Sequence, residues 1–266
     1  MKIKEFLKKH TKLFFVWTVC GFAAEIILMV VMQSWGPRLG VAESPQRLIF
    51  FDIGNWWLAR LPMFLWLASI IAKREEWLAP RGKYVEGKSY PLLSTYHYAG
   101  TALCVALFVA AGAFSWQAFD LGAAAATIAT IFFGPFVGFF TIFFGDILRS
   151  FIFPSVGNPL IWALGIAPGD GVDWMAIGVA FWLLRDTMKN KIWAFVLWVV
   201  FYVVYRGISI YDYALWIYPG SSLVPTILWW ELQFMPGSTL SAVVGGLASV
   251  GLLEAFRGRR RTKPSA

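Results

Sequence analysis

The residues best suited to chemistry are polar and aromatic side chains near one end of several long apolar segments. Aromatic rings can enclose a planar or apolar ligand, and a few charged groups can fix its polar ends. We therefore predict a small-molecule pocket made of Trp116, Arg149, Asn158, Trp162, Asp173, Trp174, Tyr202, Arg206, Ser209, Tyr213 and Glu231. Trp and Tyr are also enriched at membrane interfaces, so about half of these aromatic residues are expected to have no ligand role.

Asp146 and Arg149 lie one helical turn apart at the end of an apolar segment. Charges inside a membrane are costly, so they mark a functional position by default. Two opposite charges at this spacing can also neutralise each other along a helix. The sequence leaves both interpretations open.

The residue sets of common enzymes are not readable in this sequence. The only histidines are His10 and His97, and neither has a second residue at metal-ligand spacing. A Gly-rich phosphate loop ending in Lys-Ser or Lys-Thr is also missing, which excludes ATP hydrolysis by that route. We therefore expect a protein that is not an enzyme and that uses no cofactor and no metal.

The elements that hold the polar residues are membrane helices. Of the 266 residues, 59% are hydrophobic and 14% charged, and 15 are Trp, which indicates a polytopic membrane protein and excludes a soluble domain. The basic N-terminus resembles the start of a signal peptide, but the apolar run after it continues to Met32 and contains Glu25. We expect a retained helix there. Cys20 and Cys104 lie in apolar segments and are expected to serve packing.

Basic residues indicate the orientation of the chain. Segments 2–12, 73–88, 185–191 and 257–263 contain 18 of the 23 Lys and Arg residues, and the positive-inside rule places such segments in the cytoplasm. The net charge of +8 is then explained by topology and predicts no nucleic-acid partner. The predicted fold class is all-α, a multi-pass protein of the cytoplasmic membrane with both termini inside and eight transmembrane helices at about 13–33, 48–72, 96–114, 121–133, 135–152, 174–187, 192–213 and 237–256.

Residues 1–72 are predicted to form an N-terminal transmembrane hairpin, 73–95 a cytoplasmic connector, and 96–266 a six-helix core. Glu25 and Arg60 lie at matching depth, roughly 18 Å from the cytoplasmic ends of the two hairpin helices. An unpaired charge at that depth is costly, so we predict that these residues form an ion pair. The pair either links the two helices structurally or forms part of a transport path.

The stretch from Gly122 to Phe153 contains two short apolar helices that turn at Gly134-Pro135. Small residues follow one face of each helix, so this hairpin should be closely packed. Residues 153–173 are rich in Pro and Gly and are expected to form an ordered external loop. The apolar segment 223–230 is too short to cross a bilayer and is expected to be re-entrant or interfacial.

The region from Tyr96 to Arg261 resembles the substrate-binding S components of energy-coupling factor (ECF) vitamin transporters. The similarity lies in the alanines at a spacing of four, in FFGPFVGFF followed by GDILR, in the long second external loop and in the basic C-terminal tail. It implies that Ala102, Ala106 and Ala110 dock a membrane-embedded coupling subunit, which works with ATP-binding subunits. It also implies that the external cluster binds a vitamin-like substrate. The N-terminal hairpin departs from the six helices of that family.

Two functions follow from these observations. The first is a binding subunit of an ECF-type importer, which captures a vitamin-like molecule outside and delivers it with a partner ATPase complex. The second is a non-transport scaffold or sensor of the same fold, similar to the MreD-type cell-shape proteins, with a filled external cavity and no small-molecule ligand. The alanine stripe alone does not separate them, because such stripes also pack helices within one chain.

Overall fold

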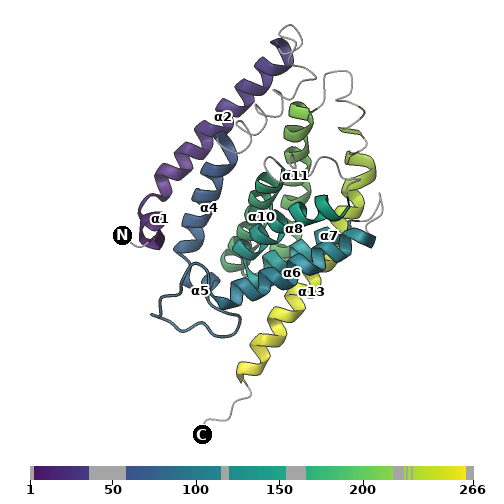
Figure 1. Ribbon diagram of the computed structural model, residues 1–266. Helices are drawn as coiled ribbons and strands as arrows, with labels where there is room; N and C mark the ends of the chain where they lie inside the picture. The colour runs from purple at the N-terminus through teal and green to yellow at the C-terminus, as the bar shows by residue number, and fades with distance from the viewer. Residues whose placement is uncertain are drawn as a thin grey trace.

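The computed structural model describes residues 3–35, 58–114, 120–153, 166–217, 225, 227–228 and 230–261. Every element within these ranges is helical (Figure 1). In chain order the elements are α1 (Ile3–Lys9), α2 (Thr11–Trp35), α4 (Leu61–Ala72), α5 (Glu75–Leu78), α6 (Thr95–Phe114), α7 (Leu121–Ile128), η2 (Ala129–Phe133), α8 (Pro135–Ile152), α10 (Ala167–Thr187), α11 (Lys191–Ile217), η5 (Trp230–Phe234) and α13 (Met235–Arg261). The two segments named η are short π-helical stretches.

Among the described residues, five helices are long and apolar enough to cross a membrane. Their apolar stretches are Thr11–Leu28, Thr95–Gly112, Pro135–Ile152, Lys191–Ser209 and Trp230–Phe256. Two shorter apolar helices span Leu58–Ala72 and Leu121–Phe133. The predicted all-helical class is confirmed for the described residues, and the five apolar helices are compatible with the predicted multi-pass membrane protein. The count of eight spans and the position of both termini stay predictions, and residues 48–57 of the predicted second span lie outside the described residues.

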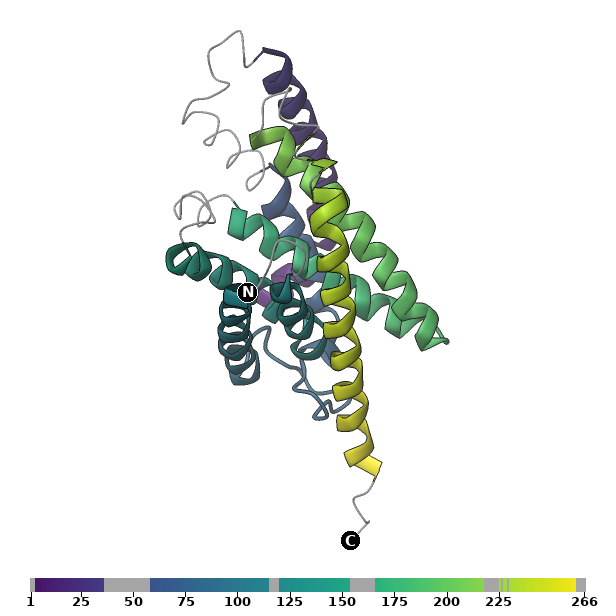
Figure 2. The same ribbon diagram turned by 90° about the vertical axis from the view of Figure 1, so that its right-hand side faces the viewer.

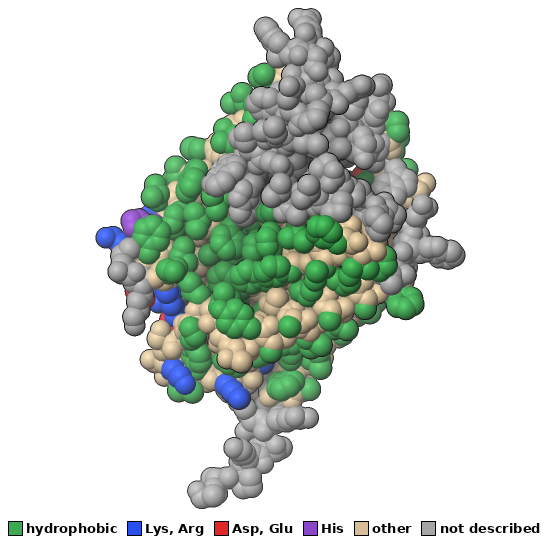
Figure 3. Space-filling model, in the orientation of Figure 1, with side chains coloured by type: hydrophobic (Ala, Val, Ile, Leu, Met, Phe, Trp, Pro, Cys, Tyr) green, Lys and Arg blue, Asp and Glu red, His purple; other side chains and the backbone are tan. Residues whose placement is uncertain are grey.

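The surface has the distribution expected of a protein in a bilayer. Hydrophobic side chains cover the middle of the visible face, and most of the visible Lys and Arg side chains lie towards its left and lower edges (Figure 3). Large apolar side chains are exposed on α2, α6, α11 and α13, among them Ile27, Leu103, Val200 and Leu247. Lipid tails are as apolar as leucine, so such positions are compatible with contact to lipid.

Helix α10 lies inside the bundle, in contact with α4, α8 and α11 (Figures 1 and 2). Nearly every residue from Ala167 to Val179 is buried. The prediction that residues up to 173 form a loop and that the span begins at 174 is therefore wrong. Pro168 is compatible with the first helical turn, where its missing N–H has no helical partner in any case. Gly171 allows close packing, since a Cβ there would lie 3.1 Å from the carbonyl oxygen of Phe139.

Helices α2 and α4 form the N-terminal hairpin and approach each other closely at Gly21. A Cβ atom at Gly21 would lie 2.8 Å from the carbonyl carbon of Leu58. The hairpin also packs on the core, because the Phe64 ring of α4 is 4.8 Å from the Phe139 ring of α8. Leu7, Phe14 and Met63 belong to the same hydrophobic cluster as the core helices.

The connector is held by contacts with α1. Lys4 Nζ lies 2.6 Å from Glu75 Oε1 and donates a 2.5 Å hydrogen bond to the carbonyl oxygen of Tyr90. Helix α5 of the connector buries Trp77 and Leu78. The connector therefore packs against its neighbours in addition to linking the hairpin and core in sequence.

The turn at Gly134-Pro135 is confirmed. Gly134 has φ = +117°, which residues with a side chain rarely adopt, and Pro135 opens α8. A Cβ at Gly138 would overlap Thr130 Oγ1 and lie 3.2 Å from Thr130 Cα. The two helices are therefore closely packed beside their turn, as predicted.

Other small residues of this hairpin and of α13 serve contacts between different helices. A Cβ at Gly145 would lie 2.5 Å from Phe108 Cδ1 of α6, and one at Gly245 would lie 2.9 Å from Ala124 Cα of α7. Helix α13 runs along the bundle towards the C-terminus (Figure 2). It starts at Met235 after η5, slightly before the predicted residue 237. Residues 223, 224, 226 and 229, which are half of segment 223–230, lie outside the described residues.

Candidate functional site

Charged side chains of α10 and α11 meet inside the bundle. Asp170 and Asp173 lie one turn apart at the start of α10, and Arg206 of α11 contacts both. Arg206 Nη1 donates a hydrogen bond to Asp170 Oδ1 and lies 3.8 Å from Asp173 Oδ2. Arg206 is 9% exposed, and Asp173 is fully buried. Charges buried to this extent need partners, which these contacts provide.

The N-terminal hairpin supplies a second arginine to Asp173. Arg60 Nε lies 3.6 Å from Asp173 Oδ1, and the Tyr205 hydroxyl donates a 2.8 Å hydrogen bond to the same oxygen. The Tyr205 oxygen also lies 3.8 Å from Met63 Sδ, one turn after Arg60 on the hairpin. The hairpin and core are therefore joined by charges and hydrogen bonds within the bundle.

The predicted Glu25–Arg60 pair agrees with the burial of both residues, which are 1% and 2% exposed. The Arg60 guanidinium lies 5.2 Å from the ring of Phe22, one turn before Glu25 on α2. Arg60 is thus beside the part of α2 that carries Glu25. The ion pair between these two residues stays a prediction.

Asp146 and Arg149 of α8 are not bonded to each other. Among the described residues, Asp146 Oδ2 and Arg149 Nε are buried atoms without a hydrogen-bond partner. The Arg149 guanidinium lies 6.0 Å from the Phe108 ring of α6, and a Cβ at Gly112 would lie 3.1 Å from Arg149 Nε. Asp146 interacts electrostatically with Asp170 and Arg149, so this pair of residues lies beside the charged cluster of α10 and α11.

Three residues of α11 that were predicted for the pocket point into the bundle. Tyr202 and Ser209 are buried together with Arg206. The Tyr202 hydroxyl is 2.8 Å from Ser238 Oγ, and Ser209 Oγ donates a 3.1 Å hydrogen bond to the Arg206 carbonyl oxygen. Trp174 is also buried, with its ring 5.7 Å from that of Tyr202. The hydroxyl groups of Tyr202 and Ser209 are therefore already hydrogen-bonded within the protein.

Glu231 approaches the same region, because a Cβ at Gly207 would lie 3.3 Å from Glu231 Oε1. Tyr213 belongs to α11, but its side chain is outside the described part of the structure. Three other residues of the predicted pocket lie outside the described residues, namely Trp116, Asn158 and Trp162. The structure therefore gathers Arg149, Asp173, Trp174, Tyr202, Arg206, Ser209 and Glu231 on neighbouring helices.

Three residues of the cluster, Arg60, Asp170 and Tyr205, were not among the residues predicted for the pocket. Arg60 was assigned to a pair with Glu25 alone, and its contact with Asp173 joins residues that are far apart in sequence. Tyr205 lies three residues after Tyr202, and that helical spacing is the signal that could have found it. Within the described residues, no three His, Cys, Asp or Glu side chains gather in a group that could hold a metal ion.

The alanine stripe of α6 faces away from the other described helices. Ala102, Ala106 and Ala110 are exposed, whereas Cys104 and Phe108 on the same helix are buried. The described part of the chain therefore does not use this stripe for its own packing. A smooth, small-residue surface allows another membrane helix to approach closely.

No protein-family model, curated protein or solved structure matches this chain.

Proposed function

We propose that this chain is the membrane-embedded substrate-binding subunit of an ECF-type importer. It captures a vitamin-like small molecule from outside and delivers it with a partner ATPase complex in the cytoplasmic membrane. The observation that carries the proposal is a pair of opposite charges on α8, the buried Asp146 and the partly buried Arg149, of which Asp146 Oδ2 and Arg149 Nε are buried atoms with no hydrogen-bond partner among the described residues. A ligand that donates to Asp146 and accepts from Arg149 would satisfy both groups.

The neighbouring ion pairs hold the helices around Asp146 and Arg149 in place. Arg206 contacts Asp170 and Asp173, and Arg60 contacts Asp173 from the hairpin. These contacts hold α10, α11 and α4 together beside α8. Because these helices are held in place before a ligand binds, less entropy is lost when the site becomes ordered. More of the contact energy then contributes to affinity.

The proposed partner complex is supported by two features of the chain. The exposed stripe of Ala102, Ala106 and Ala110 offers a docking surface to a membrane helix. The sequence has no Gly-rich phosphate loop, and in this proposal the energy for delivery comes from separate ATP-binding subunits.

A non-transport scaffold or sensor is the alternative function. The observation that favours it is the mutual pairing of Arg60, Asp170, Asp173 and Arg206, since these four groups do not need a ligand to be neutralised. A scaffold predicts that no small molecule is bound by the purified protein.

Identification of a co-purified molecule tests the two functions against each other. The protein is purified in mild detergent, denatured, and its small-molecule extract is compared by mass spectrometry with that of an unrelated membrane protein. We expect one enriched molecule in the wild type and in Arg74→Gln, a control that removes an arginine paired with Glu76. Its amount should fall roughly tenfold or more in Arg149→Gln, which loses a hydrogen bond from a charged donor. An extract without any enriched molecule would favour the scaffold.

Co-purification with ATP-binding subunits tests the coupling. Ala106→Trp places a large ring on the stripe and should abolish the association, whereas Leu107→Trp changes an exposed position that already carries a large side chain. Equal association of both variants would contradict docking through the stripe.

A further inference from the structure

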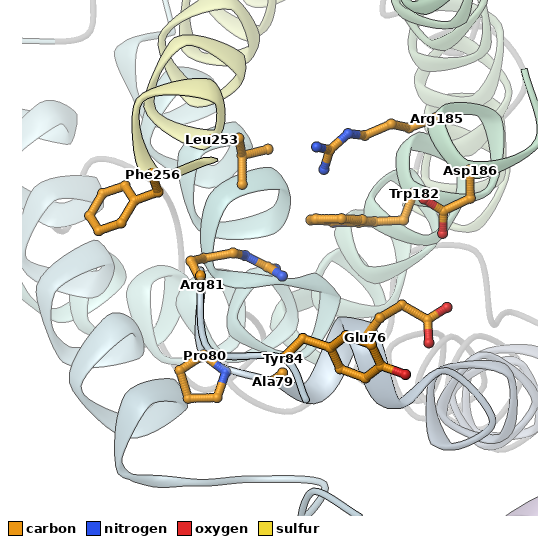
Figure 4. Close-up of a pocket in the computed structure, with 11 residues that line it drawn as sticks. Glu76, Ala79, Pro80, Arg81, Tyr84, Trp182, Arg185, Asp186, Leu253 and Phe256 are labelled. Atoms are coloured by element: carbon orange, nitrogen blue, oxygen red, sulfur yellow. The ribbon is translucent and has the colours of Figure 1, made fainter. Parts of the chain in front are cut away.

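A cavity lies at the opposite end of α8 and α10 from the candidate site. It has a volume of about 210 Å³ and is formed by the connector, the end of α10 and α13. Its lining residues are Glu76, Ala79, Pro80, Arg81, Gly82, Tyr84, Trp182, Arg185, Asp186, Leu253 and Phe256 (Figure 4). The position of Arg81 beside the Gly134 turn places this cavity on the side that the positive-inside rule assigns to the cytoplasm.

Trp182 lies between two arginines at the wall of this cavity. The guanidinium carbons of Arg81 and Arg185 are 4.3 and 4.8 Å from the centre of its ring. Figure 4 shows the indole edge-on, with Arg185 on one side and Arg81 on the other. Cation–π contacts of this kind hold both guanidinium groups at the cavity.

Two residues that line the cavity have a buried donor atom without an acceptor in the described part of the chain. Among the described residues, Arg81 Nη2 and Trp182 Nε1 lack a hydrogen-bond partner. The position of Arg81 is fixed, because its Nε donates to the carbonyl oxygen of Phe132. Burial lowers the pKa of Arg81 to about 10, so the group is still protonated at neutral pH. Buried donors without acceptors cost free energy, which an anion in the cavity would recover.

The carboxylates near the cavity bond to residues other than Arg81, although Asp186 also interacts with Arg81 electrostatically. Asp186 Oδ2 accepts a 2.8 Å hydrogen bond from Trp77 Nε1, and Glu76 Oε1 lies 3.6 Å from Arg74 Nη1. No described carboxylate forms an ion pair with Arg81. Arg81 is therefore a cation that a bound anion could neutralise.

An apolar groove adjoins the cavity at Arg185, which lines both. The groove has a volume of about 250 Å³ and is lined by Phe181, Arg185, Lys191, Ile192, Ala194, Phe195, Leu247, Val250 and Glu254. Arg185 Nη2 lies 3.9 Å from Glu254 Oε1 at the boundary. A phospholipid has a phosphate next to its acyl chains. The cationic cavity suits the phosphate, and the adjoining apolar groove suits an acyl chain.

We propose that the cavity and the groove together bind one anionic phospholipid. Its phosphate faces Arg81 and Arg185, and an acyl chain lies in the groove against Leu247 and Val250. Basic pockets between membrane helices on the cytoplasmic side are suited to anionic headgroups. The bound lipid would link the connector, α10 and α13. This site is separate from the one proposed for the transported molecule.

Titration of the delipidated full-length protein in detergent tests this proposal. The probes are dioctanoyl phosphatidylglycerol, dioctanoyl phosphatidylcholine and inorganic phosphate, and native mass spectrometry measures their occupancy. We expect phosphatidylglycerol to bind roughly tenfold or more tightly than phosphatidylcholine, because the zwitterionic headgroup carries its own cation. Arg81→Gln should lose roughly tenfold in affinity for phosphatidylglycerol. Lys83→Gln, which removes an exposed charge of the same connector outside the cavity, should bind as the wild type does.

Leu247→Trp distinguishes a lipid from a free phosphate. The larger ring fills the groove, so it should weaken phosphatidylglycerol binding and leave phosphate binding unchanged. Equal binding of the two lipids, or unchanged binding by Arg81→Gln, would overturn the proposal. Phosphate that binds as tightly as phosphatidylglycerol, together with no effect of Leu247→Trp, would also overturn it and assign the cavity to a free anion. If Arg81→Gln does not fold, Arg185→Gln provides the same comparison.

Discussion

Replacing Asp173 with Asn removes the charge that joins the N-terminal hairpin to the core. Arg60 Nε and Arg206 Nη1 lie 3.6 and 3.8 Å from its two oxygens, and the Tyr205 hydroxyl donates a 2.8 Å hydrogen bond. Removing one partner of a buried ion pair costs roughly 3–5 kcal/mol. Arg206 keeps its contact with Asp170, so we expect about 3 kcal/mol, the lower end of that range. For a chain of this size that loss lowers Tm by roughly 6–12 °C.

Thermal unfolding in detergent, followed by tryptophan fluorescence, measures this effect. Tyr205→Phe is the matched control, since it removes one hydrogen bond and leaves the carboxylate, and it should cost about 1.5 kcal/mol. Arg60→Gln is then combined with Asp173→Asn. The loss of unfolding free energy in this double variant should differ from the sum of the two single losses by about 1 kcal/mol or more. A Tm of Asp173→Asn within about 1 °C of the wild type, or additive losses in the double variant, would refute the buried link between hairpin and core.

Two further predictions concern packing and pH. Gly138→Val should cost about 1–3 kcal/mol or more, because its Cβ would overlap Thr130 Oγ1. Gly251→Ala, where no atom lies within 4 Å, should not lower Tm, and equal shifts in both variants would contradict the close packing. Burial raises the pKa of Glu75, but hydrogen bonds, the largest from Lys4, lower it overall below 4.5. The resulting stabilisation is present above pH 4.5 and is lost as the pH falls through the lowered value, so the Tm of the wild type should fall more than that of Glu75→Gln between about pH 5 and pH 3. If the plots of Tm against pH run parallel for the wild type and Glu75→Gln, the result would contradict the ion pair between Lys4 and Glu75.

The membrane helices could be predicted because their signal is strong and local. Long apolar stretches and clusters of basic residues gave helix positions that agree closely with α6, α8 and α11. The turn at Gly134-Pro135 was readable because proline opens a helix well and glycine tolerates φ = +117°. Local chemistry decides these features, so no knowledge of the tertiary structure is needed.

The start of α10 and the charged cluster could not be read in the same way. Pro168, Gly169 and Gly171 favour a loop by composition, and tertiary packing overrides that preference. The contact of Arg60 with Asp173 joins two residues that are distant in sequence, and neither helical spacing nor charge patterning indicates it. Sequence analysis placed Asp173 and Arg206 in the candidate site, but it did not predict their contacts with Arg60 and Asp170.

The cavity around Arg81 and Trp182 was also missed. Arg81 was counted only as one of the basic residues that set the orientation, and Trp182 only as part of an apolar span. Their contact depends on how the connector folds back onto the end of α10. A polar connector has no periodic pattern that would predict such a contact.

The most direct test of the proposed function is the binding isotherm of the molecule that co-purifies with the protein. Calorimetry on the ligand-free protein should show saturable binding to the wild type and to Arg74→Gln, with roughly tenfold or greater loss of affinity in Arg149→Gln. Binding by Arg149→Gln that equals the wild type, or no saturable binding by the wild type, would contradict a ligand site at Asp146 and Arg149.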